Sequence, residues 1–359
     1  MSVITIVIAA FSLAGAFDFL LGNRIGIGKE FEKGFLLFWP MSLYMLVMIV
    51  LATAIGVWLT PVFEGFYHAF GIDPSIIPAS LFANDMGGMQ LAQGVCKTAE
   101  MGNYNAFVIS SMMGCVISFT IPFSLGIVQK KQHKELFLGL LCGMVTVPVG
   151  GFVAGLICEL DPVSLLLDLL PLMILSALIG VGLIFFTEMC IRCFTVFGFF
   201  VKCLGIVGLA CAIVAFLTKT EISPYFDTFE NGAFICANAC TTLSGTLPFM
   251  FIVGKLLNKP LGRLGGRMGI NAVSALALLG NLVTNASVFG VMDRMDRKGT
   301  VLNAAFAVSA AFVFGGHLAF TMAFDSRYIV PMIVGKLISG VCAVMLALLI
   351  YREPELETE

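Results

Sequence analysis

The chain has 359 residues, of which 59% are hydrophobic and only 12% are charged, and its formal net charge is −2. Soluble domains carry about 25% charged residues and less apolar content, so this composition excludes an ordinary soluble domain. No long basic stretch with interleaved aromatic residues is present, and nucleic-acid binding is therefore not indicated.

Long apolar segments recur along the whole sequence and predict an all-α polytopic membrane protein. The first has no basic region before it and is long for a signal peptide, so we interpret it as a retained span. Nine segments are long enough to cross a bilayer: 3–21, 35–60, 105–128, 136–158, 164–187, 195–217, 233–254, 301–324 and 328–351.

Two shorter, polar-interrupted segments occupy corresponding places in the two halves of the chain. Residues 76–95 contain Asn84 and Asp85, and residues 271–292 contain Asn285. Paired short or broken segments of this kind indicate the binding site of many secondary transporters. Both segments either cross the membrane or enter and leave it on one face as re-entrant hairpins.

The distribution of basic residues favours the re-entrant interpretation. With the N-terminus outside and both short segments re-entrant, 15 of the 20 lysines and arginines lie in cytoplasmic connections and 3 lie outside. If both segments crossed, 9 would lie on each side. The positive-inside rule therefore predicts two re-entrant hairpins, an outside N-terminus and a cytoplasmic C-terminus.

A weak internal repeat agrees with this topology, because Asn105–Ser111 resembles Asn303–Ser309. Five crossings separate equivalent points, so the halves are predicted to be inverted. The predicted organisation is a first repeat at 1–158, a connecting span at 164–187, a second, inverted repeat at 195–351 and an acidic cytoplasmic tail at 352–359.

Asp85 is the strongest candidate for a functional residue, because a carboxylate at membrane depth is costly unless it is used or paired. It would act as the counter-ion of a cationic solute or coupling ion or as a proton carrier, or else cap a hairpin arm or form a structural salt bridge. Asn84 and Gln90 offer hydrogen bonds nearby, although either could simply satisfy hairpin backbone. Asn285 is the neutral candidate in the second hairpin.

His317 is the only histidine inside an expected span, where it would serve as a proton relay, a substrate ligand or a structural hydrogen-bonding group. The other charged groups in the spans are interpreted as side chains that reach the interface: Asp18, Asp168, Lys202 and Lys336.

Catalytic signatures are absent: no HExxH, GxSxG or GxxxxGK[ST] motif occurs. The CxxC of Cys190 and Cys193 has no second Cys or His pair beside it, which argues against a metal site. We therefore expect no enzyme activity, no cofactor and no metal. The glycine patterns of the spans permit a packed homo-oligomer.

Several sequence blocks resemble the ethanolamine permease family (EutH type). They are FANDMGG at 82–88, SSMMG at 110–114, GMVTVP at 143–148, NAAFAVSAAF at 303–312 and PMIVGKLI at 331–338, with His317 also on a matching position. The resemblance covers almost the whole chain. It implies an inner-membrane protein that imports ethanolamine for a cobalamin-dependent lyase, and that does not itself bind cobalamin.

The resulting hypothesis is that Asp85 pairs with the ammonium of ethanolamine while Asn285, with Asn84 or Gln90, bonds its hydroxyl. Two other interpretations stay open: a transporter of another small polar or cationic solute, and a membrane sensor or binding subunit without transport. Facilitated, proton-coupled and sodium-coupled mechanisms are all compatible with the sequence.

Overall fold

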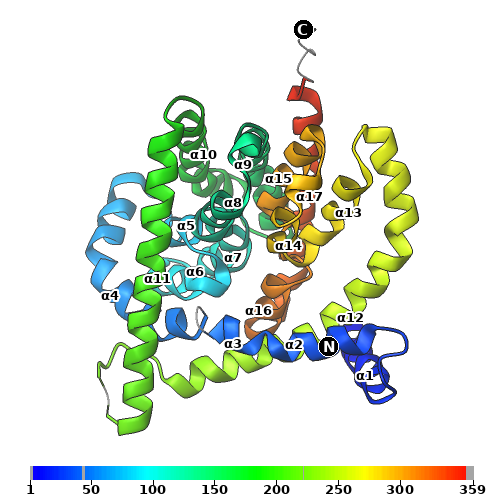
Figure 1. Cartoon of the computed structure of the whole chain (residues 1–359). Coiled ribbons are helices and arrows are strands. Elements are labelled where there is room, and N and C mark those ends of the chain that lie inside the picture. Colours follow the sequence, from blue (N-terminus) through cyan, green and yellow to red (C-terminus); the bar gives the residue numbers. More distant parts are fainter. Residues whose placement is uncertain (1–2, 43–44, 221, 353–359) are drawn as a thin grey trace.

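A computed structural model describes residues 3–42, 45–220 and 222–352, and within these ranges the chain is helical with no strand (Figure 1). This confirms the all-α membrane-protein class. The long helices are α1 (Val3–Leu20), α4 (Met45–Phe70), α9 (His133–Ile157), α10 (Pro162–Phe185), α11 (Thr187–Thr218), α12 (Phe229–Met268) and α17 (Ile329–Ile350). The α-helices between or beside them are α2 (Ile27–Leu36), α3 (Phe38–Ser42), α5 (Ile76–Leu81), α6 (Gly88–Val95), α7 (Ala99–Tyr104), α8 (Ile121–Ile127), α13 (Ala272–Val283), α14 (Asn285–Phe289), α15 (Arg297–Ala310) and α16 (Gly316–Phe324).

Two wide π-helical segments, η2 (Asn105–Gly114) and η3 (Val116–Thr120), join α7 to α8. Within the described residues, 7 helical stretches are long and apolar enough to cross a membrane. The expected total of nine is not confirmed. Residues 43 and 44 of the expected span 35–60, and residues 353–359 of the expected acidic tail at 352–359, lie outside the described residues.

The expected span 301–324 is divided into α15 and α16 by a non-helical segment, residues 311–315. Here the backbone N–H groups of Phe312 and Phe314 donate to the carbonyl oxygens of Asn281 (3.0 Å) and Leu282 (2.8 Å). The second short segment thus supplies the hydrogen bonds that the interrupted helix has lost, as backbone at membrane depth requires.

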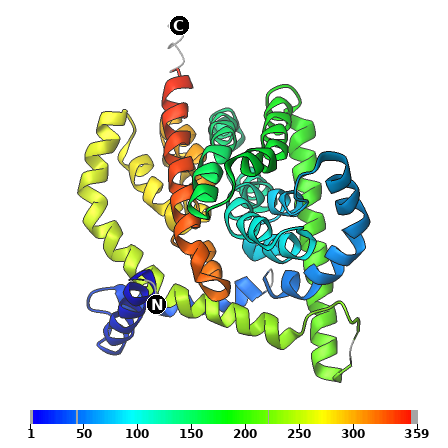
Figure 2. The same cartoon turned by 180° about the vertical axis from the view of Figure 1, so that it is seen from behind.

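The centre of the molecule is a bundle of α9, α15 and α17, which lie side by side in both views (Figures 1 and 2). Glycines on α9 permit this close approach. A Cβ atom on Gly139 would clash with the carbonyl oxygen of Val301 in α15, and one on Gly150 would clash with that of Gly335 in α17. Small residues at helix contacts are the usual way for membrane helices to pack closely.

Helix α12 changes direction along its length and runs beside α1 and α2 before it turns toward α13 (Figures 1 and 2). Pro248 lies inside this helix, and an internal proline removes a backbone hydrogen bond and bends a helix. Asp18 does not reach the interface as expected. It is 3% exposed and accepts the N–H groups of Ile25 (2.8 Å) and Gly28 (2.8 Å) at the start of α2.

The two ends of the first short segment, residues 76–95, are held together by hydrogen bonds. The carboxylate of Asp73 accepts the backbone N–H groups of Lys97 (2.9 Å) and Thr98 (3.2 Å). Just inside this closure, the side chain of Asn105 donates to Ser75 Oγ (2.9 Å). The two ends of the segment therefore lie side by side, which is the arrangement that a hairpin requires.

The second short segment is closed in the same way by Asp296. Its Oδ1 accepts the backbone N–H of Asn271 (2.9 Å) and the hydroxyl of Ser274 (2.6 Å). The side chain of Asn303 then donates to the carbonyl oxygens of Ser274 and Gly299, both at 2.9 Å. Asn105 and Asn303 are the first residues of the two matching sequence blocks, and they hold equivalent places.

Candidate functional site

The first hairpin is interrupted between α5 and α6, at residues 82–87. Gly87 has φ 89° and ends the short turn that contains Asp85; glycine adopts this left-handed conformation without steric cost. The carbonyl group of Phe82 packs against Gly88 and Gly114, and a Cβ atom on either glycine would clash with its oxygen. The hairpin tip is thereby seated on η2.

Asp85 occupies this interruption with its side chain 22% exposed, whereas the groups around it are nearly inaccessible. It lies three residues before the first residue of α6, and its Oδ2 lies beside Gly316 at the N-terminus of α16, 3.4 Å from where a Cβ atom on Gly316 would stand. Helix N-termini carry partial positive charge. Both helices therefore favour the ionised carboxylate at this point.

His317, the candidate in α16, lies beside Asp85, a pairing that the sequence did not predict. Its Nε2 is 3.9 Å from Asp85 Oδ1, and its side chain is only 2% exposed. The Phe312 ring, from the interrupted segment, packs against the imidazole with 5.1 Å between ring centroids. The accessible carboxylate and the buried imidazole thus form a pair that joins the first hairpin to α16.

Lys336 is the third ionisable member of this site and was missed by sequence reasoning. It was expected to reach the interface, but it is 0% exposed. Its ammonium donates to the Ser111 carbonyl in η2 and lies 3.1 Å from His317 Nδ1. The feature of the sequence that could have identified Lys336 as a site residue is its position within the PMIVGKLI block. The side chain of Lys202 lies outside the described part of the structure.

The second hairpin is interrupted at Thr284, between α13 and α14. Asn285 is fully buried there, and its Nδ2 donates to Thr120 Oγ1 at 3.0 Å. Thr120 is in turn 3.9 Å from the sulfur of Cys115, which interacts electrostatically with both Asp85 and Lys336. Thr120 and Cys115 therefore lie between Asn285 and the charged groups.

The other two predicted ligands lie in the first hairpin with unused hydrogen-bonding capacity. Asn84 Oδ1 accepts the backbone N–H of Asp85 (3.0 Å), while Asn84 Nδ2 is buried without a partner among the described residues. Nε2 and Oε1 of Gln90 and Oδ1 of Asn285 are likewise buried without a hydrogen-bond partner among the described residues. Buried polar atoms are normally satisfied, so these are candidate contacts for a polar solute. The side chain of Gln90 makes no hydrogen bond to Asp85 within the described residues.

Asp168, which was also expected at the interface, is instead 2% exposed in α10 and lies beside Asn105 and Tyr104. It belongs to the closed end of the first hairpin and does not join Asp85, His317 and Lys336.

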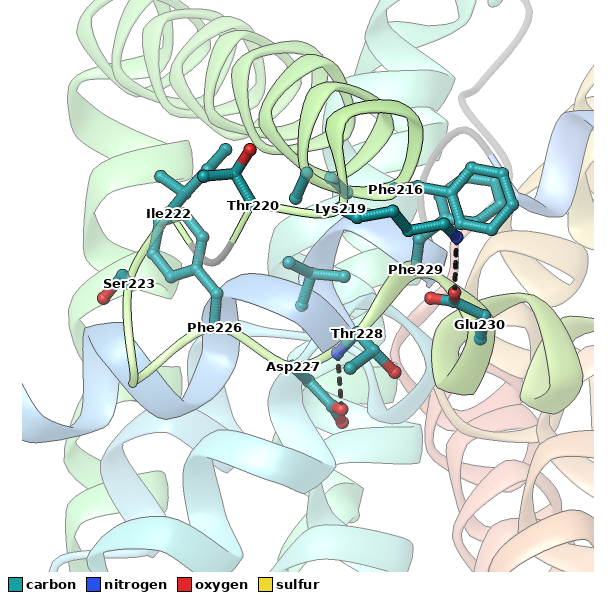
Figure 3. Close-up of a pocket in the computed structure, with 13 residues that line it drawn as sticks. Phe216, Lys219, Thr220, Ile222, Ser223, Phe226, Asp227, Thr228, Phe229 and Glu230 are labelled. Atoms are coloured by element: carbon teal, nitrogen blue, oxygen red, sulfur yellow. Dashed lines mark hydrogen bonds and ion pairs between the residues drawn. The ribbon is translucent and has the colours of Figure 1, made fainter.

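A cavity of about 260 Å³ lies away from this site, at the turn between α11 and α12 (Figure 3). Lys219 crosses it, with its ammonium 4.3 Å from the Phe216 ring centroid and 3.9 Å from Glu230. Thr228 donates to Asp227 on its lower side in the figure. A second cavity, of about 270 Å³, lies over Gly280 and Ser287 of the second hairpin. Neither contains Asp85 or His317.

Comparisons with known proteins agree over nearly the whole chain. The family model described as "Ethanolamine utilisation protein, EutH" matches residues 1–350. A "Probable ethanolamine permease EutH" of Listeria monocytogenes is 38% identical over 95% of this chain and 92% of its own length. The protein of the same name in Salmonella typhimurium is 34% identical over 90% of this chain and 86% of its own length.

An "Uncharacterized protein YxeR" of Bacillus subtilis is 35% identical over 95% of this chain and 92% of its own length. No solved structure shows significant similarity to the chain. The family match, the apolar helices and the permease relatives identify a multi-pass membrane protein of the transporter class. The chain belongs to the EutH family of ethanolamine utilisation proteins.

Proposed function

We propose that this protein is a secondary transporter that imports ethanolamine across the cytoplasmic membrane and binds it at Asp85, between two re-entrant hairpins. The observation that carries the proposal is the accessible Asp85 carboxylate within a broken hairpin of an otherwise apolar protein. Such a charge is retained in a membrane protein when it has a task. The names of the relatives support ethanolamine as the solute.

Ethanolamine has two features for a site to recognise, an ammonium and a hydroxyl. In our proposal Asp85 pairs with the ammonium, and His317 holds the carboxylate from its buried side. The hydroxyl bonds to the unsatisfied amide groups of Asn285, Asn84 or Gln90. A charge-assisted bond supplies most of the affinity, while the amides exclude amines that lack a hydroxyl.

The closure of both segments at Asp73 and Asp296 supports the re-entrant topology. We further propose that residues 1–158 and 195–351 form the two inverted repeats, with the N-terminus outside and the C-terminus inside. Movement of one bundle against the other around Asp85 would then give alternating access.

The test is uptake of labelled ethanolamine into proteoliposomes at mildly acidic pH, where little uncharged ethanolamine crosses the lipid unaided. We expect saturable uptake by the wild type and none by Asp85→Asn. Asp293→Asn, at an exposed carboxylate after the second hairpin, is the matched control and should transport normally. Normal uptake by Asp85→Asn would refute the assignment of the site.

The same assay separates the two alternatives. A transporter of another solute would show uptake of that solute, and ethanolamine would not compete with it in a substrate panel. A sensor or binding subunit would bind ethanolamine without flux into the vesicles.

A further inference from the structure

A protonated Lys336 would place a positive charge in the interior of the protein, where its side chain is 0% exposed. Its ammonium has two polar neighbours, the carbonyl of Ser111 and the Nδ1 atom of His317 at 3.1 Å. An ammonium buried without an opposite charge costs several kcal/mol. The anion that offsets it is Asp85, which interacts with Lys336 electrostatically from the far side of the same imidazole.

A protonated Lys336 would fix how protons are distributed over these groups. Its ammonium would donate toward Nδ1 of His317, so that nitrogen would present its lone pair. Nε2 then carries the hydrogen of the neutral ring and directs it toward Asp85 Oδ1, 3.9 Å away. The ionisable groups that face Lys336 are Asp85 from the first hairpin, His317 from α16 and the Cys115 thiol between η2 and η3. With a neutral ring and thiol, the empty site has no net charge.

Binding of an ammonium at Asp85 would disturb this balance. The site would then hold two cations and one anion, in surroundings where unit charges a few ångströms apart interact by several kcal/mol even at an effective dielectric constant near 20. Loss of one proton from the site restores neutrality. Lys336 is the group that can supply it, because a lysine releases its proton readily when it is buried near another cation.

We propose that Lys336 is a tethered counter-cation of Asp85 that gives up one proton for each organic ammonium bound, so that the protein is an electroneutral exchanger of ammonium substrate for proton. The inference rests on the proposed function and adds its mode of coupling. The charge balance is complete: –NH₃⁺ of Lys336 becomes –NH₂ and H⁺, and the substrate cation replaces the lost charge.

The three side chains also give the proton a route. Lys336 transfers its proton to Nδ1 of His317, while Nε2 passes its own proton to Asp85 once the 3.9 Å gap closes to hydrogen-bond distance. Asp85 is the only accessible member of the three, so the proton leaves to water from its carboxyl group. The substrate ammonium then pairs with the regenerated carboxylate, and His317 is left neutral as the opposite tautomer.

The first test measures proton release on binding, with the purified full-length protein in weakly buffered detergent solution containing a pH indicator. Ethanolamine hydrochloride is the probe, and binding is measured in parallel by equilibrium dialysis. We expect the wild type to release about one proton per ethanolamine bound. Lys336→Met, which has similar bulk and no charge, should bind without release. Lys134→Met, at an exposed lysine, should behave as the wild type.

Lys336→Arg is the complementary variant, because a guanidinium cannot be deprotonated in proteins. It should weaken ethanolamine binding at least about tenfold, since the second positive charge can no longer leave. If Lys336→Met fails to fold, judged by size exclusion and thermal unfolding, Lys336→Arg and the wild-type proton count still decide the proposal. Binding by the wild type without proton release overturns it, as does tight binding by Lys336→Arg.

The second test is the current evoked by ethanolamine on proteoliposomes adsorbed to a solid-supported membrane. The wild type should transport without a transport current, and Lys336→Met should produce one, because the substrate charge then crosses alone. A wild-type transport current would overturn the exchange mechanism while leaving ethanolamine transport intact. Absence of any ethanolamine binding or flux in the wild type would instead refute the proposed function, and the inference with it.

Discussion

The two hairpins are built on the same frame and differ at their tips. Each is closed at its ends by an aspartate, Asp73 in the first and Asp296 in the second. In each hairpin, the backbone carbonyl at the end of the first arm packs against a glycine in the segment that follows the hairpin. Phe82 packs on Gly114, and Val283 packs on Gly315.

The tips carry different chemistry on this common frame. The first presents a carboxylate that contacts a buried His–Lys pair, and the second presents the amide of Asn285, which is bonded to Thr120. The spans behind them differ too: η2 and η3 continue as a wide helix, whereas α15 and α16 are separated by residues 311–315. A monovalent cation needs one counter-charge, so a carboxylate at one of the two tips is enough.

The largest effect is expected from moving the carboxylate between the tips. The double variant Asp85→Asn with Asn285→Asp keeps the charge count but places the anion away from His317 and Lys336. We expect no saturable ethanolamine uptake, because the new carboxylate is buried without a cation and Lys336 has lost its anion. Proteoliposome uptake measures this, with membrane insertion checked by protein content of the vesicles. Restored uptake would show that the two tips are interchangeable.

The next effect concerns the glycines that seat the tips. Gly114→Ala and Gly315→Ala should each lower the free energy of unfolding by about 3 kcal/mol, because the added methyl would collide with backbone that cannot move aside. Thermal unfolding in detergent gives the comparison. Gly126→Ala in α8 is the control, since no atom lies within 4 Å of its added Cβ. A large effect at one glycine alone would break the structural equivalence of the hairpins.

A smaller effect is expected from the neutral tip. Asn285→Ala removes the bond to Thr120 and the proposed bond to the substrate hydroxyl. We expect KM for ethanolamine to rise about fivefold with little change in kcat, because a neutral hydrogen bond contributes about 1 kcal/mol. Ser287→Ala is the control, since that exposed hydroxyl bonds only to its own helix at Thr284. An unchanged KM in Asn285→Ala would remove the second hairpin from the substrate site.

A modest loss of stability is expected from changes at the closures. Asp73→Ala and Asp296→Ala each remove bonds from a carboxylate to backbone N–H groups near the surface, which contribute about 1–2 kcal/mol. The loss should be larger for Asp296, which also caps α15 and bonds Ser274. Denaturant titration measures both, against Asp293→Ala. Equal losses would mean that the second closure gains nothing from its additional contacts.

Sequence reasoning reached the helical class, both short segments and the separate candidates Asp85 and His317, because each depends on local composition or on one conspicuous polar residue. It did not predict that Asp85 and His317 lie together. It missed the interruption at 311–315, since an apolar run of ordinary length reads as one continuous span. The hydrogen bonds that permit the break come from Asn281 and Leu282 in another segment.

Lys336 was misinterpreted for a related reason. A lysine on an apolar helix usually extends to the interface, and nothing in its own neighbourhood contradicts that. Its partners are Ser111, from the other half of the chain, and His317 on a separate helix. Only the tertiary arrangement shows that the charge is enclosed.

The closure at Asp73 also has a mechanical consequence. Because its carboxylate ties the start of the first hairpin to Lys97 and Thr98, the two arms cannot separate while these bonds persist. A displacement of the hairpin that carries Asp85 would then move both of its arms together, as one rigid unit. Bending would then occur outside these hydrogen bonds, and Gly71, with φ 67° at the end of α4, is suited to it on that side because glycine accepts both signs of φ. A substitution that restricts the backbone at Gly71 should therefore slow the movement of the first hairpin without changing any residue that contacts the solute.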